Sequence, residues 1–171
     1  WGPLIVKWGG YFISKTRLMS FAPGQVNEGK LQWCALAVCG VVQEEFEARG
    51  HLEIAAQWKR IASAECSRLW ANMDSLGWCW RAGAPLPQAL SPQATQAPGL
   101  PGPGDFVFYG EEEGGKLHFA HVDLFEQSTV NGFDSIGGNT GDPPVYDRVG
   151  RVRHRTLAKL SRVIGYGRVP W

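Results

Sequence analysis

Four cysteines and four histidines are the residues of this chain best suited to nucleophilic and acid–base chemistry. Cys34 lies in the segment QWCALA (residues 32–37), where a loop gives way to a strongly apolar stretch. A thiol at the N-terminus of a helix lies near the positive end of the helix dipole, which favours the thiolate. Cys34 is therefore the first candidate for a nucleophile. A buried structural thiol is the alternative, because most cysteines are core residues.

The other three cysteines are weaker candidates for a nucleophile. Cys79 also follows a tryptophan, but the residues after it, 81–85, cannot form a helix. Cys39 lies on a different face of the same helix as Cys34, and Cys66 is expected in the middle of a second helix as a structural thiol. No cysteine or histidine cluster has the spacing of a zinc site, so we predict neither a metal nor a cofactor.

A nucleophilic cysteine needs a base, and two histidines lie on one predicted strand. His118 and His121 are three residues apart, which places them on opposite faces of that strand. His121 then shares its face with Phe119 and Asp123. Periodicity alone does not choose between the two histidines.

The second ring nitrogen of such a base needs an acceptor that orients the ring. Asn139 lies 18 residues beyond His121 in the glycine-rich segment 137–141, just after the next predicted strand. An antiparallel neighbour would bring this amide beside the histidine. A simple turn is the alternative interpretation of the segment. A phosphate-binding loop is not expected, because the segment follows no βα unit and contains no lysine.

Helices are expected first along the chain, and strands after them. The pattern predicts a buried helix over residues 34–48 that ends at Gly50, and a second helix from Ile54 to Leu76 that ends near Gly77. Residues 82–104 are rich in Pro, Ala, Gln and Gly, which predicts an exposed loop or insertion.

The predicted strands follow one another without intervening helices. They cover residues 106–109, 117–125, 130–136, 149–153 and 162–168, with a further short strand over 10–14 and loops over 111–115 and 137–144. Helices followed by consecutive strands favour an α+β fold in which helices pack on an antiparallel sheet.

Composition narrows the class of protein. The 171 residues suit a single domain, 1–171. A net charge of +1 gives no electrostatic footprint for nucleic acid. No apolar run reaches the ~18 residues of a membrane span, so no membrane insertion is expected. The first residues, WGPLIVKWGG, lack the layout of a secretory signal peptide. The eight tryptophans predict an aromatic-rich core or groove.

Four motifs, taken in order, resemble those of the CHAP family (cysteine- and histidine-dependent amidohydrolases/peptidases) within the NlpC-type, papain-like superfamily. They are WCA at 33–35, PGDFVF at 103–108, HVDL at 121–124 and IGGNT at 136–140. The closing segment VIGYGRV at 163–169 is also similar to the last strand of the family. The resemblance covers about residues 25–170 in scattered blocks.

The resemblance implies a papain-like fold in which Cys34 attacks an amide carbonyl. It implies that His121, rather than His118, acts as base and then as acid, and that Asn139 orients the imidazole. The oxyanion would be held by the backbone N–H of Cys34 and by a nearby donor, for which Gln32 is our candidate.

Two positions depart from the pattern of the family. Many relatives carry Glu where Gly137 stands, and Gly often follows His-Val where Asp123 stands. Asp123 is therefore the second candidate, after Asn139, for the group that orients His121. Asp123 also joins Gln32 and Trp33 as a candidate substrate or oxyanion residue.

The activity that the resemblance implies is hydrolysis of an amide bond of peptidoglycan through a thioester. The bond would be either muramoyl–L-alanine or one within the stem or cross-bridge peptide. Such an enzyme acts on the bacterial cell wall, in the periplasm or outside the cell. It would serve as a phage lysin or as an interbacterial toxin, and a toxin would have a cognate inhibitor (immunity) protein. The alternatives are an inactive binding or structural module of the same fold, and acyl transfer to an amine.

Overall fold

The computed structural model describes residues 34–90, 99–140, 148–154 and 162–170, with the backbone alone for 139–140 and 148–154. Three helices and six strands follow one another in this part of the chain. They are α3 (Cys34–Ala48), α4 (Leu52–Ile61), α5 (Cys66–Asp74), β1 (Cys79–Arg81), β2 (Phe106–Glu113), β3 (Lys116–Thr129), β4 (Gly132–Thr140), β5 (Arg148–His154) and β6 (Val163–Gly167).

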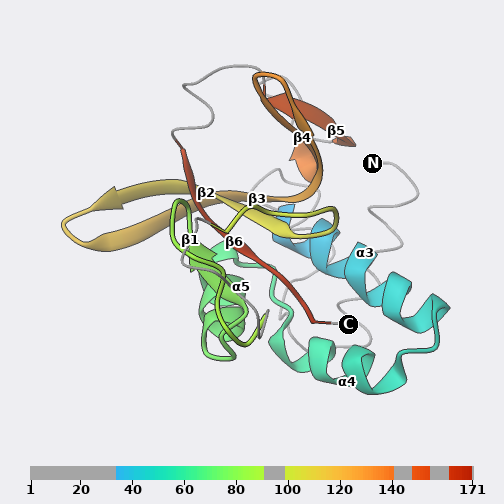
Figure 1. Ribbon diagram of the computed structural model, residues 1–171. Helices are drawn as coiled ribbons and strands as arrows, with labels where there is room; N and C mark the ends of the chain where they lie inside the picture. The colour runs from blue at the N-terminus through green and yellow to red at the C-terminus, as the bar shows by residue number, and fades with distance from the viewer. Residues whose placement is uncertain (1–33, 91–98, 141–147, 155–161, 171) are drawn as a thin grey trace, which may run out of the picture.

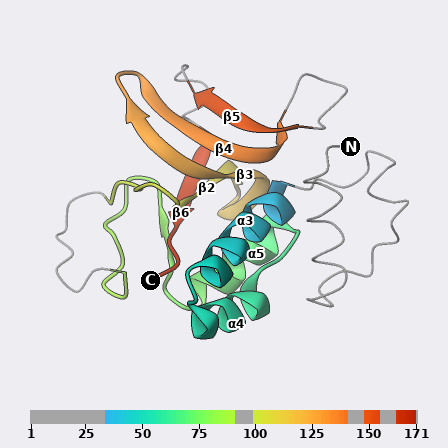
Figure 2. The ribbon, with the colours of Figure 1, turned by 90° about the vertical axis from the view of Figure 1, so that its right-hand side faces the viewer.

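The six strands form one sheet in the order β1-β6-β2-β3-β4-β5, and every neighbouring pair is antiparallel. The three helices lie together on one side of this curved sheet (Figure 2). The α+β class and the antiparallel sheet expected from the sequence are thereby confirmed.

The helix α3 is the central helix of the molecule. Its first seven residues, 34–40, are all buried, as the apolar sequence predicts. It packs against β3 and β4 on one side and against α4 on another. Gly50 ends it as expected: with a φ of 74°, Gly50 permits the amide of His51 to bond to the carbonyl of Phe46, at 2.9 Å.

The single helix predicted over residues 54–76 is wrong, because α4 and α5 are separate helices. After α4, Ala62 takes an extended conformation, with φ of −56° and ψ of 140°. The Ser63 hydroxyl then accepts a hydrogen bond from the backbone N–H of Glu65 at 3.1 Å, which competes with helical pairing. The Asn72 side chain donates to the carbonyl of Ile61 at 2.8 Å and fixes the two helices to each other.

The strands β2 to β5 are longer than the sequence pattern predicts, whereas β6 is shorter than the strand predicted over 162–168. β2 continues to Glu113, so the loop expected over 111–115 is reduced to a turn at Gly114 and Gly115, which both have positive φ. β4 continues to Thr140 and includes the start of the loop expected over 137–144. The β2–β3 hairpin projects from the body of the molecule (Figure 1). Its outer residues are exposed to solvent, and for this reason charged residues can form the ends of its two strands. The strand expected over 10–14 lies outside the described residues.

A bulge in the β2–β3 pair changes the expected faces of β3. Tyr109 pairs with His121, but the next residue, Gly110, pairs with Phe119. The extra residue sends the Phe119 side chain into the helix-side core, where its ring lies 5.5 Å from that of Trp70. Phe119 and His121 therefore do not share a face as predicted. Gly110 is required there, because a Cβ would lie 1.9 Å from a carbonyl oxygen of β3.

The described parts of the proline-rich segment, residues 82–90 and 99–104, form a loop, as predicted. They contain no helix and no strand beyond an isolated bridge at Pro85. The Trp80 indole donates a hydrogen bond to the Gly99 carbonyl at 2.9 Å and holds the returning chain against β1.

Buried apolar side chains form two clusters, one on each side of the sheet. The larger lies between the helices and the sheet and includes Trp58, Trp70 and Phe106. The smaller contains Val107, Tyr109, Phe125 and Phe133. No helix in the described ranges is both long and apolar enough to cross a membrane.

Candidate active site

Cys34 is the first residue of α3, and its thiol contacts β3 at the N-terminal end of that helix. Its exposed fraction is 0%. The sulfur lies 3.5 Å from the sulfur of Cys66. The pKa of Cys34 lies well below its ordinary value, chiefly because of the hydrogen bond with Cys66. Burial opposes this shift, and His121 and the backbone N–H of Val122 add to it. The site therefore favours the thiolate of Cys34 more than an ordinary cysteine environment does.

His121 lies on β3 between the thiol and a carboxylate. Its Nε2 atom is 2.7 Å from Oδ1 of Asp123. It also hydrogen-bonds to Cys34, for which Nδ1 is the ring nitrogen left. Burial acts to lower the pKa of His121, but the hydrogen bonds and charges of Asp123 and Cys34 outweigh it and raise the pKa to about 10. The favoured state is therefore an imidazolium beside a thiolate.

Asp123 is the carboxylate that orients this imidazole. It is fully buried, and its second oxygen accepts a hydrogen bond from the Ser135 hydroxyl at 2.8 Å. The Tyr109 side chain also hydrogen-bonds to Asp123 and Ser135, and burial raises the pKa of Tyr109, which keeps its hydroxyl protonated. A buried carboxylate held by three partners can support a cation beside it.

Gly137 on β4 makes room for this carboxylate. A Cβ at Gly137 would lie 1.7 Å from Oδ1 of Asp123, so no larger residue fits while Asp123 holds its present position. The two departures from the CHAP pattern thus occupy one place in the fold. Asp123 on β3 and Gly137 on β4 lie against each other, so the carboxylate fills the space that a side chain at residue 137 would occupy.

The other predicted site residues divide between those that the structure describes and those that it does not. His118 is exposed and pairs with Glu111 on the β2–β3 hairpin. Asn139 lies in the irregular stretch of β4 between Gly137 and Thr140, and its side chain is outside the described part. Gln32 and Trp33 also lie outside it. The roles expected for these three residues stay predictions.

Cys66 is the site residue that the sequence interpretation missed. It was expected in the middle of a helix, but it begins α5, and its thiol contacts the proposed nucleophile. Because Cys34 and Cys66 are 32 residues apart in the chain, no local sequence pattern predicts their contact. The other two cysteines are buried, and both were the weaker candidates: burial raises the pKa of Cys39 to about 12 and raises that of Cys79 as well.

His121 is the more accessible member of the pair. The side chain of His121 is 25% exposed, whereas Cys34 has an exposed fraction of 0%.

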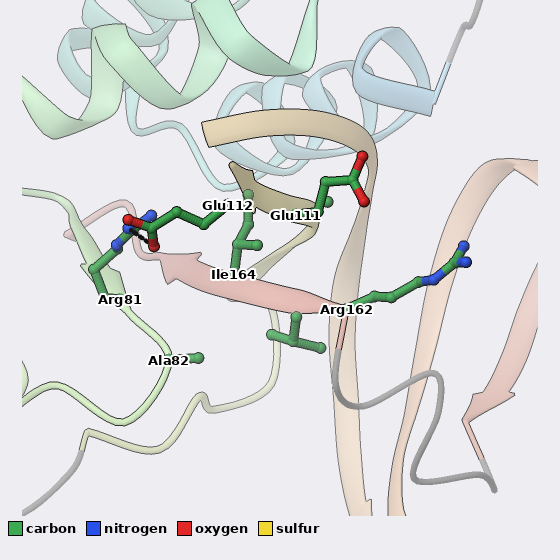
Figure 3. Close-up of a pocket in the computed structure, with 8 residues that line it drawn as sticks. Arg81, Ala82, Glu111, Glu112, Arg162 and Ile164 are labelled. Carbon is green, nitrogen blue, oxygen red and sulfur yellow. Dashed lines mark hydrogen bonds and ion pairs between the residues drawn. The ribbon is translucent and has the colours of Figure 1, made fainter. Parts of the chain in front are cut away.

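The pocket in Figure 3 is a different feature. It is a hollow of about 460 Å³ at the edge formed by β1, β6 and β2, and its lining includes Arg81, Glu112 and Arg162. Arg81 and Glu112 form an ion pair across 2.6 Å. None of the candidate catalytic residues lines this pocket. Within the described ranges, no group of three or more His, Cys, Asp or Glu side chains is placed to hold a metal ion.

The arrangement as a whole combines an enclosed thiolate, an imidazolium and a fixed carboxylate. Such a set can attack an electrophilic carbon and then protonate a leaving group. In comparisons with known proteins, no protein family, curated protein or solved structure matches this chain.

Proposed function

We propose that this chain is a papain-like, CHAP-type cysteine hydrolase that cleaves an amide bond of peptidoglycan. The observation that carries the proposal is the continuous chain of contacts from Cys34 through His121 to Asp123. Nucleophile, base and orienting group come from α3 and β3, and in the sequence they lie in the motifs WCA and HVDL.

The reaction follows from the protonation states of the site. The Cys34 thiolate attacks the carbonyl carbon of the amide, and the tetrahedral adduct places its negative charge on the carbonyl oxygen. The His121 imidazolium then gives its proton to the amine nitrogen as the C–N bond breaks, which leaves a thioester. His121 next takes a proton from water, and the resulting hydroxide attacks the thioester. The Cys34 thiolate then leaves, and the carboxylic acid product releases its proton to solvent as a carboxylate.

The beginning of α3 is the natural place for the oxyanion. The backbone N–H of Cys34 belongs to the first turn of the helix, where amides lack intrahelical partners and the helix dipole is positive. One preorganised donor of this kind contributes about 10²–10³-fold to turnover in other hydrolases. Gln32 is our candidate for the second donor.

Digestion of purified peptidoglycan sacculi tests the proposal. Mass spectrometry of the soluble fragments should reveal new amino and carboxyl ends, which also identify the scissile bond. Cys34→Ala and His121→Ala should abolish release, whereas His118→Ala, the matched control on the same strand, should release fragments at the parental rate. Products joined to an amine would indicate acyl transfer instead, and equal digestion by Cys34→Ala would exclude the cysteine mechanism.

The full enclosure of Cys34 is the observation that favours the alternative, an inactive binding or structural module. Iodoacetamide separates the two, since it reports thiolate reactivity without a substrate. A nucleophile should be alkylated near neutral pH much faster than Cys39 or Cys79. A Cys34 that reacts no faster than these buried thiols would support the inactive module.

We place the action of the enzyme at the bacterial cell wall, in the periplasm or outside the cell. The biological use is that of a phage lysin or an interbacterial toxin. Co-expression distinguishes them, because a toxin directed to the periplasm requires a cognate inhibitor protein for survival of the producing cell.

A further inference from the structure

We propose that Cys66 is a positioning residue that donates its S–H group to the Cys34 thiolate and so holds the nucleophile ready for attack. The inference rests on the proposed function in one respect, because it takes Cys34 as the nucleophile. It assigns a task to a second thiol that neither the sequence motifs nor the Cys–His–Asp chain requires.

The contact between the two sulfurs is a direct one. The Sγ atoms lie 3.5 Å apart, and both residues are buried, with exposed fractions of 0% for Cys34 and 8% for Cys66. Both thiols stand at the start of a helix, α3 and α5 respectively. A hydrogen bond to an ionised acceptor is about twice as strong as one between neutral groups, and water does not compete with it here.

The direction of the bond follows from the other partners of Cys34. His121 and the backbone N–H of Val122 already donate toward this sulfur, which therefore behaves as an acceptor. The hydrogen bond with Cys34, burial and the neighbouring negative charge raise the pKa of Cys66, so its thiol keeps its proton and can donate it. In the proposed pair the proton lies on Cys66 and the charge lies on Cys34.

The remaining buried thiols show what this contact adds. Cys39 donates to the carbonyl oxygen of Ser63 at 3.5 Å, and Cys79 donates to that of Trp70 at 3.8 Å. In both cases the thiol satisfies a neutral backbone group, and no charged partner is involved. The thiol of Cys66 instead contacts the sulfur of the proposed nucleophile, Cys34.

The pH dependence of Cys34 alkylation tests this role without any substrate. The rate constant of Cys34 with iodoacetamide is measured against pH by peptide mass spectrometry in the full chain. Cys66→Ala removes the donor and should raise the midpoint by about one pH unit, the size expected for one charge-assisted hydrogen bond. Cys66→Ser keeps a donor, and its midpoint should lie nearer to the parent than to Cys66→Ala.

Cys39→Ala is the matched control, because it removes a buried thiol from the same core without removing a donor to Cys34. Its midpoint should equal that of the parent. Circular dichroism verifies the fold of each variant, and Cys66→Val, which fills the space without a donor, replaces Cys66→Ala if the latter does not fold.

Two results would overturn the inference: an unchanged midpoint in Cys66→Ala or Cys66→Val, or a Cys66→Ser midpoint shifted as far as theirs. Digestion of sacculi is a separate readout. If the midpoint shifts as expected but the parent leaves sacculi intact, the thiol pair stands and the proposed hydrolase fails. If sacculi are digested and the midpoint does not move, the hydrolase stands and Cys66 is a packing residue.

Discussion

At the scale of single residues, the site depends on how charge is distributed around His121. A thiolate lies at one ring nitrogen and a carboxylate at the other, so the protonated ring is held by two negative groups. Ser135 and Tyr109 stabilise the carboxylate by hydrogen bonds, and Cys66 does the same for the thiolate. Each buried negative group thus has its own neutral donor, which offsets part of the cost of removing it from water.

Asp123→Asn tests this distribution, because it keeps the shape of the side chain and removes its charge. The imidazolium must donate a proton in the first step, and its pKa of about 10 keeps it protonated at neutral pH. Without the carboxylate this pKa falls toward its ordinary value of about 6.5. We expect turnover to fall about 10²–10⁴-fold and the alkaline limb of the kcat/KM profile to move to lower pH. The assay is muropeptide release against pH.

Asn139→Ala serves as the comparison for this variant. If Asp123 orients the ring, Asn139→Ala should keep the alkaline limb of the parent. A profile that moves in Asn139→Ala and stays in place in Asp123→Asn would return the orienting role to the asparagine.

The stability of the fold should also depend on pH through the raised pKa of His121. Protonated His121 stabilises the fold below about pH 6.5, and this contribution is lost as the pH rises through about 10.

Sequence reasoning pointed to Cys34, His121 and Asp123, which the structure brings together, but not to all of their neighbours. Cys34 was selected by its place at the start of a predicted helix, whereas His121 was chosen over His118 by the resemblance of its motif to the CHAP pattern. Asp123 ranked second, because the sequence cannot show that the space above Gly137 is filled from the neighbouring strand. Cys66 was missed because its contact depends on how α5 packs against α3.

At the scale of elements, the sequence pattern predicted which helices and strands form better than it predicted where they begin and end. The buried helix up to Gly50 was predicted correctly, since an apolar run and a C-terminal glycine are local signals. The break between α4 and α5 was missed because Ser63 interrupts the helix through one side-chain hydrogen bond while the apolar spacing continues. The far end of β2 was missed because Glu111–Glu113 pair with β3, which the charged sequence does not reveal.

The β3–β4 pair allows a sharper test, in which the glycine and the acidic residue change places between the two strands. Gly137→Glu alone should abolish the proposed hydrolysis, since its Cβ meets the Asp123 carboxylate. Asp123→Gly alone should also abolish it, since His121 loses its partner. The double variant removes the clash and supplies a carboxylate from β4, so it should recover at least tenfold over either single variant. Muropeptide release measures activity, and urea unfolding measures the clash.

The double variant gives a decisive result because a side chain at residue 137 would occupy the space that the Asp123 carboxylate now fills. Independent positions would give additive losses, so the double variant would be worse than each single variant. An additive loss would show that the carboxylate of β3 and the glycine of β4 are unrelated. Recovery would show that the sheet accepts the orienting group from either strand.

At the scale of the whole molecule, one ion pair connects the middle of the chain to its end. Asp105 stands just before β2, and Arg168 stands just after β6. The guanidinium donates to both carboxylate oxygens, from Nε at 2.8 Å and from Nη2 at 2.7 Å. The backbone N–H of Gly102 donates to the same carboxylate at 2.6 Å. The proline-rich segment and the last strand are therefore fixed at one point, next to the strand that pairs with β3.

Arg168→Ala should destabilise the whole domain, because it leaves the buried Asp105 carboxylate without its cation. Asp105 is 5% exposed and Arg168 28% exposed, so water can reach the pair only in part. We expect the free energy of unfolding to fall by about 2–3 kcal/mol. Arg168→Lys should recover only a fraction of this lost free energy, since an ammonium cannot bind both oxygens in the same way.

The matched control is Arg81→Ala, which breaks the exposed pair with Glu112 and should cost under about 1 kcal/mol. Urea unfolding followed by tryptophan fluorescence measures all three, and equal losses in Arg168→Ala and Arg81→Ala would show that the Asp105 pair is no more than a surface contact.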